Sequence, residues 1–226
     1  DYGLFTNLSP DHIGPGEHAD FEEYLYYKTR LLNMCRIGLV NKDDEHAEQI
    51  IKAADCELYT YSEKGKEADF SASDIRYVSQ PDFVGTEFHI SGKYDMEVRL
   101  GIPGLFNVVN ALAAVSVCSF LDLDKEKISH ALEHIRVNGR MEIVYTSERC
   151  TVLVDYAHNA VSMESLLSTL RDYKPKRLVC VFGCGGNRSK DRRYSMGEIG
   201  GKLADLSIIT ADNSRYEKVE DIIADI

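Results

Sequence analysis

The sequence lacks a surplus of positive charge. Its 226 residues include 26 Lys and Arg against 37 Asp and Glu, which gives a formal charge of −11, and no block of Lys or Arg offsets this. Proteins that bind a nucleic acid backbone cluster cations along it, so nucleic acid is excluded as a general partner. A single anionic nucleotide is still compatible with this composition, because a glycine-rich loop and one or two arginines are enough to bind it.

Long apolar runs and paired cysteines are also missing. No stretch approaches the roughly 20 apolar residues that cross a bilayer, and no basic segment followed by an apolar leader opens the chain. The six cysteines form no C-x-x-C pair, and most lie in apolar runs, which is typical of buried free thiols in a reducing compartment. We therefore expect a cytoplasmic protein with no membrane insertion, and we expect it to be a monomer.

Apolar periodicity indicates the elements of the first part of the chain. It predicts helices over 20–35, 44–54, 104–121 and 124–135, strands over 36–40 and 58–61, and a hairpin within 70–101. Asp20 and Asp124 stand where helix caps are expected. Alternate apolar residues from Phe88 to Leu100 fall on one face of the hairpin, with its turn at 91–93.

The pattern changes around Gly139. Beyond it, strands over 152–155, 178–182 and 206–210 alternate with helices over 162–173, 194–204 and 219–226. These strands are continuous apolar runs, which is how a parallel sheet covered on both faces reads. We therefore predict an α/β fold in two parts, 1–142 and 143–226. The chain opens on what reads as a strand end and stops inside a helix, so we expect a fragment of a longer protein.

Three polar clusters follow successive strands of the second part: DYAHN, GCGGNR and ADNSR. Ligands of open parallel sheets bind beyond the carboxyl ends of the strands, which favours a shared site over coincidence. Asp155 and His158 suit acid–base chemistry or a nucleotide contact, and equally an Asx turn with a hydrogen-bonded His. Asp212 and Arg215 suit a zwitterionic ligand, although Asp212 with Asn213 also suits a simple turn.

The loop GCGGNRSKDRR invites a phosphate-binding interpretation. It lacks the third glycine of G-x-G-x-x-G and the G-K-[ST] ending of a P-loop, so neither fingerprint is present. Its cations are suited to carboxylates or phosphates, and a solvated basic loop before a helix is the equally weighted alternative. These cations are Arg188, Lys190, Arg192 and Arg193.

The opening segment TNLSPDHIGPGEH holds an Asp-His pair, Asp11 and His12, and a second histidine, His18. Such a set is able to ligate a metal, although Mg²⁺ prefers oxygen ligands. A polar turn with hydrogen-bonded histidines is the alternative. From the residues alone, the sequence indicates a cytosolic α/β protein with an anion-handling site.

Seven stretches together resemble the Mur ligases, most closely the MurE type. In chain order they are TNLSPDHI, YLYYK, GLFNVVNALAA, VNGRME, VDYAHN, FGCGGNR and TADNSR. The resemblance implies part of a central ATPase domain followed by a Rossmann-like C-terminal domain. It also implies an ATP-dependent amide ligase that adds the third peptide residue to UDP-MurNAc-L-Ala-D-Glu in peptidoglycan synthesis, through an acyl phosphate and with Mg²⁺.

The resemblance also assigns roles to residues. His12 matches a Mg²⁺-site histidine, and Lys28 matches a lysine that is carbamylated in the family. The stretches that contact ATP correspond to Asn107, Asn110, Arg140, Asp155 and His158. The amino-acid pocket corresponds to Arg188, Asp212, Asn213 and Arg215, whose arginines would grip the distal carboxylate of meso-diaminopimelate.

The chain departs from the family pattern at several places. DHIGPGEH is two residues longer between its histidines than the usual DHLDYHG, Ser214 replaces the proline of DNPR, and GGNRS replaces GGDRD. Arg215 is retained, which favours diaminopimelate over lysine, because lysine offers no second carboxylate. Other ligases of the superfamily and a non-catalytic binding paralogue are the alternatives. The family's G-x-x-G-K-[ST] loop is absent, so we expect this chain alone not to turn over ATP.

Overall fold

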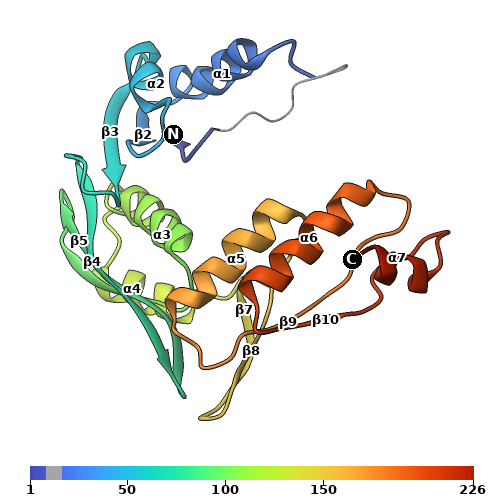
Figure 1. Cartoon of the computed structure of the whole chain (residues 1–226). Coiled ribbons are helices and arrows are strands. Elements are labelled where there is room, and N and C mark those ends of the chain that lie inside the picture. Colours follow the sequence, from blue (N-terminus) through green and yellow to red (C-terminus); the bar gives the residue numbers. More distant parts are fainter. Residues whose placement is uncertain (9–16) are drawn as a thin grey trace. The chain divides into compact units, whose positions relative to one another are not determined.

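The computed structural model describes residues 1–8 and 17–226. The chain forms two compact units (Figure 1). The first comprises residues 1–78 and 83–136, and the second comprises residues 79–82 and 137–226. No helix in the described ranges is long and apolar enough to cross a membrane.

The first unit is built on a six-stranded sheet in the order β1-β2-β3-β4-β5-β6. Its strands are β1 (Tyr2–Phe5), β2 (Ile37–Asn41), β3 (Glu57–Ser62), β4 (Phe70–Gln80), β5 (Phe83–Gly92) and β6 (Met96–Leu100). The ladders from β1 to β4 are parallel, and β5 pairs with β6 antiparallel. Every residue of β2 is buried, as expected for a central parallel strand.

Helices complete the core of the first unit. They are α1 (Phe21–Thr29), the 3-10 helix η1 (Arg30–Asn33), α2 (Ala47–Ala53), α3 (Leu105–Cys118) and α4 (Lys125–His134). Asp20 and Asp124 accept hydrogen bonds from the first turns of α1 and α4, which confirms both predicted caps. The helix predicted over 20–35 is divided, because its last turn tightens into η1.

The predicted hairpin exists as β5 and β6. Phe88 lies opposite Val98 and Ile90 opposite Met96, and these four side chains are buried on one face. Two details differ from the prediction. The turn lies two residues later than expected, at 93–95 between Gly92 and Met96, and the apolar pattern did not reveal β4 as a separate long strand.

The second unit has short strands. Its elements are β7 (Glu142–Thr146), β8 (Thr151–Val154), α5 (Ala160–Asp172), β9 (Val179–Phe182), α6 (Lys190–Leu203), β10 (Leu206–Ile209) and α7 (Val219–Asp225). β9 and β10 pair in parallel, whereas β7 and β8 form an antiparallel pair. Met163 and Leu167 of α5 and Met196 of α6 belong to the buried core of this unit, together with Leu178, Cys184 and Ile222.

The α/β class is confirmed, with a mainly parallel central sheet. The prediction that the strands of the second unit are covered on both faces is wrong for the described residues. Alternate residues of β8, β9 and β10 remain exposed, namely Val152, Val154, Val179, Val181, Leu206 and Ile208. β7 was not predicted, and α6 begins at Lys190 rather than Tyr194.

Candidate functional site

Two of the three polar clusters lie side by side after β9 and β10. Parallel pairing of Phe182 with Ile209 brings both strand ends to the same edge. The GCGGNR loop then contacts the ADNSR loop, where the amide of Gly186 donates to the carbonyl oxygen of Asn213 at 2.8 Å. These two clusters are therefore adjacent, whereas the shared ligand site that the sequence favours remains a prediction.

Glycine makes this close approach possible. A Cβ atom on Gly183 would collide with the carbonyl oxygen of Thr210, and one on Gly186 with that of Ser214. Any side chain at either position would push the loops apart. The loop over 183–189 and the loop over 210–217, which we call the two acceptor loops, thus touch along their backbones.

The acceptor loops present Arg188 and Arg215 to solvent. No polar partner for either guanidinium occurs among the described residues, so both are available to an anion. Asn187 and Arg215 have positive φ angles of 52° and 51°. Such backbone is uncommon for an arginine, and it is found preferentially at functional sites. Asp212 and Asn213 are also exposed, and Asn213 Oδ1 accepts from the Arg215 amide at 3.3 Å.

The prediction that Lys190 and Arg193 are available to bind a carboxylate or phosphate is wrong. The Arg193 side chain is only 1% exposed, and its guanidinium donates to Glu217 Oε1 and Asp225 Oδ2, both at 2.8 Å. Lys190 forms an ion pair with Asp225 at 2.9 Å. Both cations lie in α6 and are already paired, so neither is free for a ligand. Arg188, which lies in the loop over 183–189 before α6, has no such ion pair among the described residues.

The pKa values around Arg193 reflect these contacts. The hydrogen bond from Arg193 is the main cause that lowers the pKa of Glu217, followed by the amide of Asn187. Contacts from Lys190 and then Arg193 lower the pKa of Asp225. The same two carboxylates raise the pKa of Arg193. All three groups are therefore charged at neutral pH.

Asp155 ties two sequence motifs together. Its Oδ2 accepts from the amide of Met141 and its Oδ1 from the amide of Ala157, both at 2.8 Å. The second contact is the Asx turn that the sequence left as one alternative. The first joins the GRME stretch to the end of β8, where Met141 has a φ of 45°. With both oxygens engaged, the Asp155 side chain stabilises the backbone conformation of the GRME stretch and of the turn after β8.

The residue after Asp155, Tyr156, has an exposed aromatic ring. The Arg140 guanidinium stands 4.7 Å from the centroid of Tyr156, and the His158 ring lies 5.0 Å from it. His158 Nδ1 also lies 3.1 Å from the carbonyl oxygen of Tyr156. Tyr156 is 60% exposed, so its ring offers a planar surface flanked by a cation. Such a surface suits stacking of a planar base.

In the first unit, Lys28 lies at the end of α1. Its Nζ is 5.1 Å from the centroid of Tyr24, and the His18 ring is 5.1 Å from the same centroid. Lys28 and His18 therefore share one aromatic neighbour. His12 and Asp11 lie outside the described residues. No group of three side chains of metal-binding type gathers within residues 1–8 and 17–226.

Asn107 and Asn110 lie one turn apart near the start of α3. The Asn107 amide donates to the Pro103 carbonyl oxygen at 2.7 Å, and the Asn110 amide lies 3.4 Å from Asn107 Oδ1. Asn107 thus holds the entry of the helix, where Gly104 has a φ of 107°. Asn110 is exposed and presents its amide to solvent.

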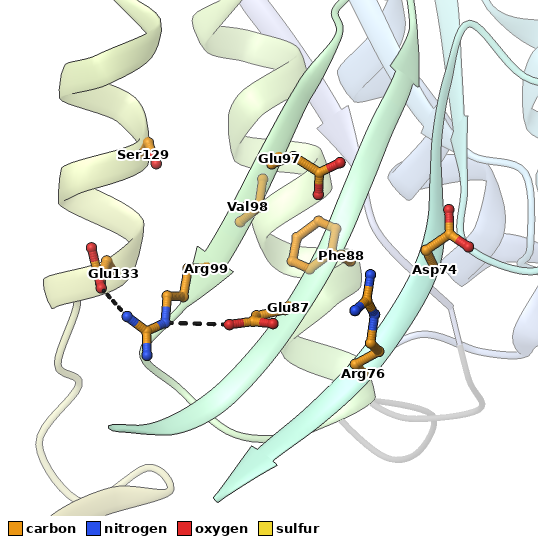
Figure 2. Close-up of a pocket in the computed structure, with 9 residues that line it drawn as sticks. All are labelled: Asp74, Arg76, Glu87, Phe88, Glu97, Val98, Arg99, Ser129 and Glu133. Carbon is orange, nitrogen blue, oxygen red and sulfur yellow. Dashed lines mark hydrogen bonds and ion pairs between the residues drawn. The ribbon is translucent and has the colours of Figure 1, made fainter. Parts of the chain in front are cut away.

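The first unit also has a groove of about 430 Å³ over β4 to β6 and α4 (Figure 2). Arg99 lies in it between Glu87 at 3.4 Å and Glu133 at 3.0 Å, so its charge is already compensated. None of the predicted site residues lines this groove.

Two residues of the second unit, Tyr156 and Glu217, were not predicted from the sequence to contribute to the site. Tyr156 stands inside the DYAHN motif, and an aromatic residue between Asp155 and His158 was the available signal. Glu217 carried no comparable signal. Its partner Arg193 is 24 residues away in the sequence, and only the fold brings the two together.

Comparisons with known proteins place the chain in a family. Residues 1–118 match the Mur ligase middle domain, and residues 139–226 match the Mur ligase glutamate ligase domain. The UDP-N-acetylmuramoyl-L-alanyl-D-glutamate–2,6-diaminopimelate ligase 2 of Clostridium acetobutylicum is 41% identical over 225 residues, which cover 99% of this chain and 45% of the relative. The corresponding ligase of Alkaliphilus oremlandii is 40% identical over 98% of this chain and 45% of its own length.

Solved structures agree. A structure of a UDP-N-acetylmuramoyl-L-alanyl-D-glutamate–2,6-diaminopimelate ligase matches with a TM-score of 0.74 and 31% identity, over 100% of this chain and 46% of that one. The chain thus spans about half the length of the relatives that it matches. The matching middle-domain model alone covers more than half of the 226 residues. The chain belongs to the Mur ligase family.

Proposed function

We propose that this chain forms part of an ATP-dependent ligase that adds an amino acid, meso-diaminopimelate, to UDP-MurNAc-L-Ala-D-Glu in peptidoglycan synthesis. The relatives of 40% and 41% identity carry the name of that ligase. In this reaction ATP phosphorylates the substrate carboxylate, and the amine of the amino acid displaces phosphate from the acyl phosphate. Residues 1–142 would belong to the ATPase domain and residues 143–226 to the C-terminal domain.

The pair of unpaired arginines on the acceptor loops carries this proposal. Arg188 and Arg215 are exposed on two loops that are fixed against each other by the Gly186–Asn213 hydrogen bond. A guanidinium recognises a carboxylate by two parallel hydrogen bonds, which makes two arginines suited to an amino acid with a distal carboxylate. Asp212 supplies a negative charge for an ammonium group. Lysine would leave the distal contact unmade.

The nucleotide would lie against the Tyr156 ring, with Arg140 and His158 beside it. The family resemblance also proposes Asn107 and Asn110 of α3 as ATP-contacting residues. Asp155 would hold the GRME stretch in place through the Met141 amide. Mg²⁺ would neutralise phosphate charge, with His12 and a carbamylated Lys28 as its proposed protein contacts. A carbamate turns the Lys28 ammonium into an oxygen-bearing anion, which suits the oxygen preference of Mg²⁺.

Phosphate release tests the proposal. The assay uses the longest chain that the gene encodes, with Mg-ATP, UDP-MurNAc-L-Ala-D-Glu and either meso-diaminopimelate, L-lysine or no amino acid. We expect release that depends on diaminopimelate. Release with lysine alone would keep the ligase and overturn the proposed pocket. No release with either amino acid would contradict a ligase that adds diaminopimelate or lysine. That result would favour a non-catalytic binding role or a ligase with another acceptor. The reaction's components also imply a cytoplasmic enzyme, which remains a prediction.

A further inference from the structure

A buried cation of α6 contacts one of the two acceptor loops through Glu217. Arg193 is 1% exposed and contacts Glu217 and Asp225, and its Nε has no hydrogen-bond partner among the described residues. The side chains of Glu217 and Asp225 remain 28% and 19% exposed. Such a partly buried ion network brings little net stability, because the lost hydration of the buried guanidinium offsets the attraction between the charges. A well-packed apolar side chain would fill the same space as well or better. The network is therefore explained better by the geometry that it fixes than by the stability that it adds.

Glu217 transmits this geometry to both acceptor loops. Its Oε1 accepts from the Asn187 amide as well as from Arg193, and its own amide donates to the Ser214 carbonyl oxygen at 3.0 Å. The Asn187 side chain returns the contact, since its Oδ1 accepts from the Tyr216 amide at 3.2 Å. One carboxylate thus joins α6 to the turn before Arg188 and to the turn after Arg215.

Both turns held in this way have unusual backbone. Asn187 and Arg215 both have positive φ angles, which the surrounding contacts must enforce. Arg188 follows Asn187 directly, and Arg215 is separated from Glu217 by one residue. Small rotations at either turn would move a guanidinium by more than the tolerance of a two-point hydrogen bond.

We propose that Arg193 is a positioning residue of the amino-acid site, which acts through Glu217 to set the relative placement of Arg188 and Arg215. This role rests on the proposed function. Arg193 touches no ligand itself. It determines how well the site discriminates a substrate with a distal carboxylate, rather than how fast phosphate is transferred.

Amide hydrogen exchange on this chain tests the structural half of the proposal. The variants are Glu217→Ala, Glu217→Gln and Arg193→Met, with Lys202→Met as the matched control, because Lys202 forms an exposed ion pair on the same helix. We expect Glu217→Ala and Arg193→Met to speed exchange at the acceptor loops about tenfold or more, while α5 is less affected. Glu217→Gln should lie between, since its amide oxygen still accepts hydrogen bonds from Asn187 and Arg193 but carries no charge to strengthen them. Lys202→Met should resemble wild type.

Unchanged loop exchange in Glu217→Ala would overturn the proposal. So would equal acceleration over the whole second unit in Glu217→Gln, because that result would indicate a purely structural role. Glu217→Gln keeps a neutral acceptor in place, so it serves even where Arg193→Met does not fold.

Steady-state kinetics of the longest encoded chain test the functional half. We expect Glu217→Gln and Arg193→Lys to raise the KM for diaminopimelate about tenfold while the KM for ATP stays within about twofold of wild type. Equal changes in both KM values would overturn the positioning role. If wild type uses neither diaminopimelate nor lysine, the proposed function fails, and the exchange measurement still decides whether Arg193 holds the two loops.

Discussion

The two units build their strands from similar apolar runs and bury them very differently. In β2 of the first unit all five residues are buried, whereas in β9 of the second unit Val179 and Val181 are 44% and 62% exposed. α3 contacts β2, β3 and β5 of the first sheet, while the described residues of the second unit leave one face of β9 and β10 bare. A continuous apolar run therefore predicts a strand, but coverage of its faces depends on other elements.

The units also differ in the size of their apolar cores. The first unit has a large core, in which Leu39, Tyr61 and Phe70 are 0% exposed. The second unit holds its acceptor loops with a buried arginine and two carboxylates. Apolar packing supplies stability without direction, whereas charged hydrogen bonds fix the orientation of the groups that they join.

The largest effect is expected from truncation of the first core. Leu39→Ala removes a fully buried side chain from β2, and it should lower the free energy of unfolding of the first unit by about 3–5 kcal/mol. Urea titration followed by unit-resolved amide exchange measures this, because two units need not unfold together. A loss below about 1 kcal/mol would contradict the packing of β2 described above.

A smaller effect is expected where the acceptor loops touch. Gly186→Ala places a Cβ against the Ser214 carbonyl oxygen, so the loops must separate, and the second unit should lose about 1–3 kcal/mol. Gly201→Ala on α6 is the matched control. Nothing lies within 4 Å of its added Cβ, so alanine should raise helix stability by about 0.5–1 kcal/mol. Equal responses of the two variants would show that the loops do not touch in solution.

Acid should weaken the second unit through Glu217. Its pKa in the folded chain is lowered from the ordinary value of 4.5, so its contribution to stability is present above that pH and is lost as the pH falls below it. Glu217→Gln removes this titration. A pH series of urea midpoints from 7 to 3 should therefore fall less steeply for Glu217→Gln than for wild type. Parallel curves would show that Glu217 is not paired as described.

The smallest effect is expected on the bare face of the second unit. Ile208→Thr changes a side chain that is 45% exposed, so the unfolding free energy of this chain should change by less than about 0.5 kcal/mol. The same variant in the longest encoded chain sharpens the comparison with β2. A much larger loss there would show that additional residues cover this face.

The sequence predicted most elements because apolar period and capping residues are local signals. Asp20 and Asp124 cap the helices that they were expected to cap. Cation placement was predicted less well. The basic loop and the start of α6 read alike in sequence, so Arg193 was grouped with Arg188, although the fold buries the first and exposes the second. The partners Glu217 and Asp225 are distant in the chain, and no periodicity could reveal them.

The roles of the site residues depended on resemblance rather than on physics. For Asp155, the sequence pattern left acid–base chemistry, a nucleotide contact and an Asx turn open, and in the structure both its oxygens accept hydrogen bonds from backbone amides. Its role toward ATP remains a prediction. His12 lies outside the described residues, so its assignment to Mg²⁺ also remains a prediction.

Selectivity between amino-acid acceptors tests directly whether Arg215 binds the distal carboxylate of diaminopimelate. The measurement compares kcat/KM for meso-diaminopimelate with that for L-lysine in the longest encoded chain, for wild type and for Arg215→Met. Arg171→Met is the control, since Arg171 pairs with Asp205 away from the acceptor loops. We expect Arg215→Met to lower the preference for diaminopimelate about 100-fold, because a distal carboxylate loses its charged partner. An unchanged preference in Arg215→Met would show that Arg215 does not bind the distal carboxylate.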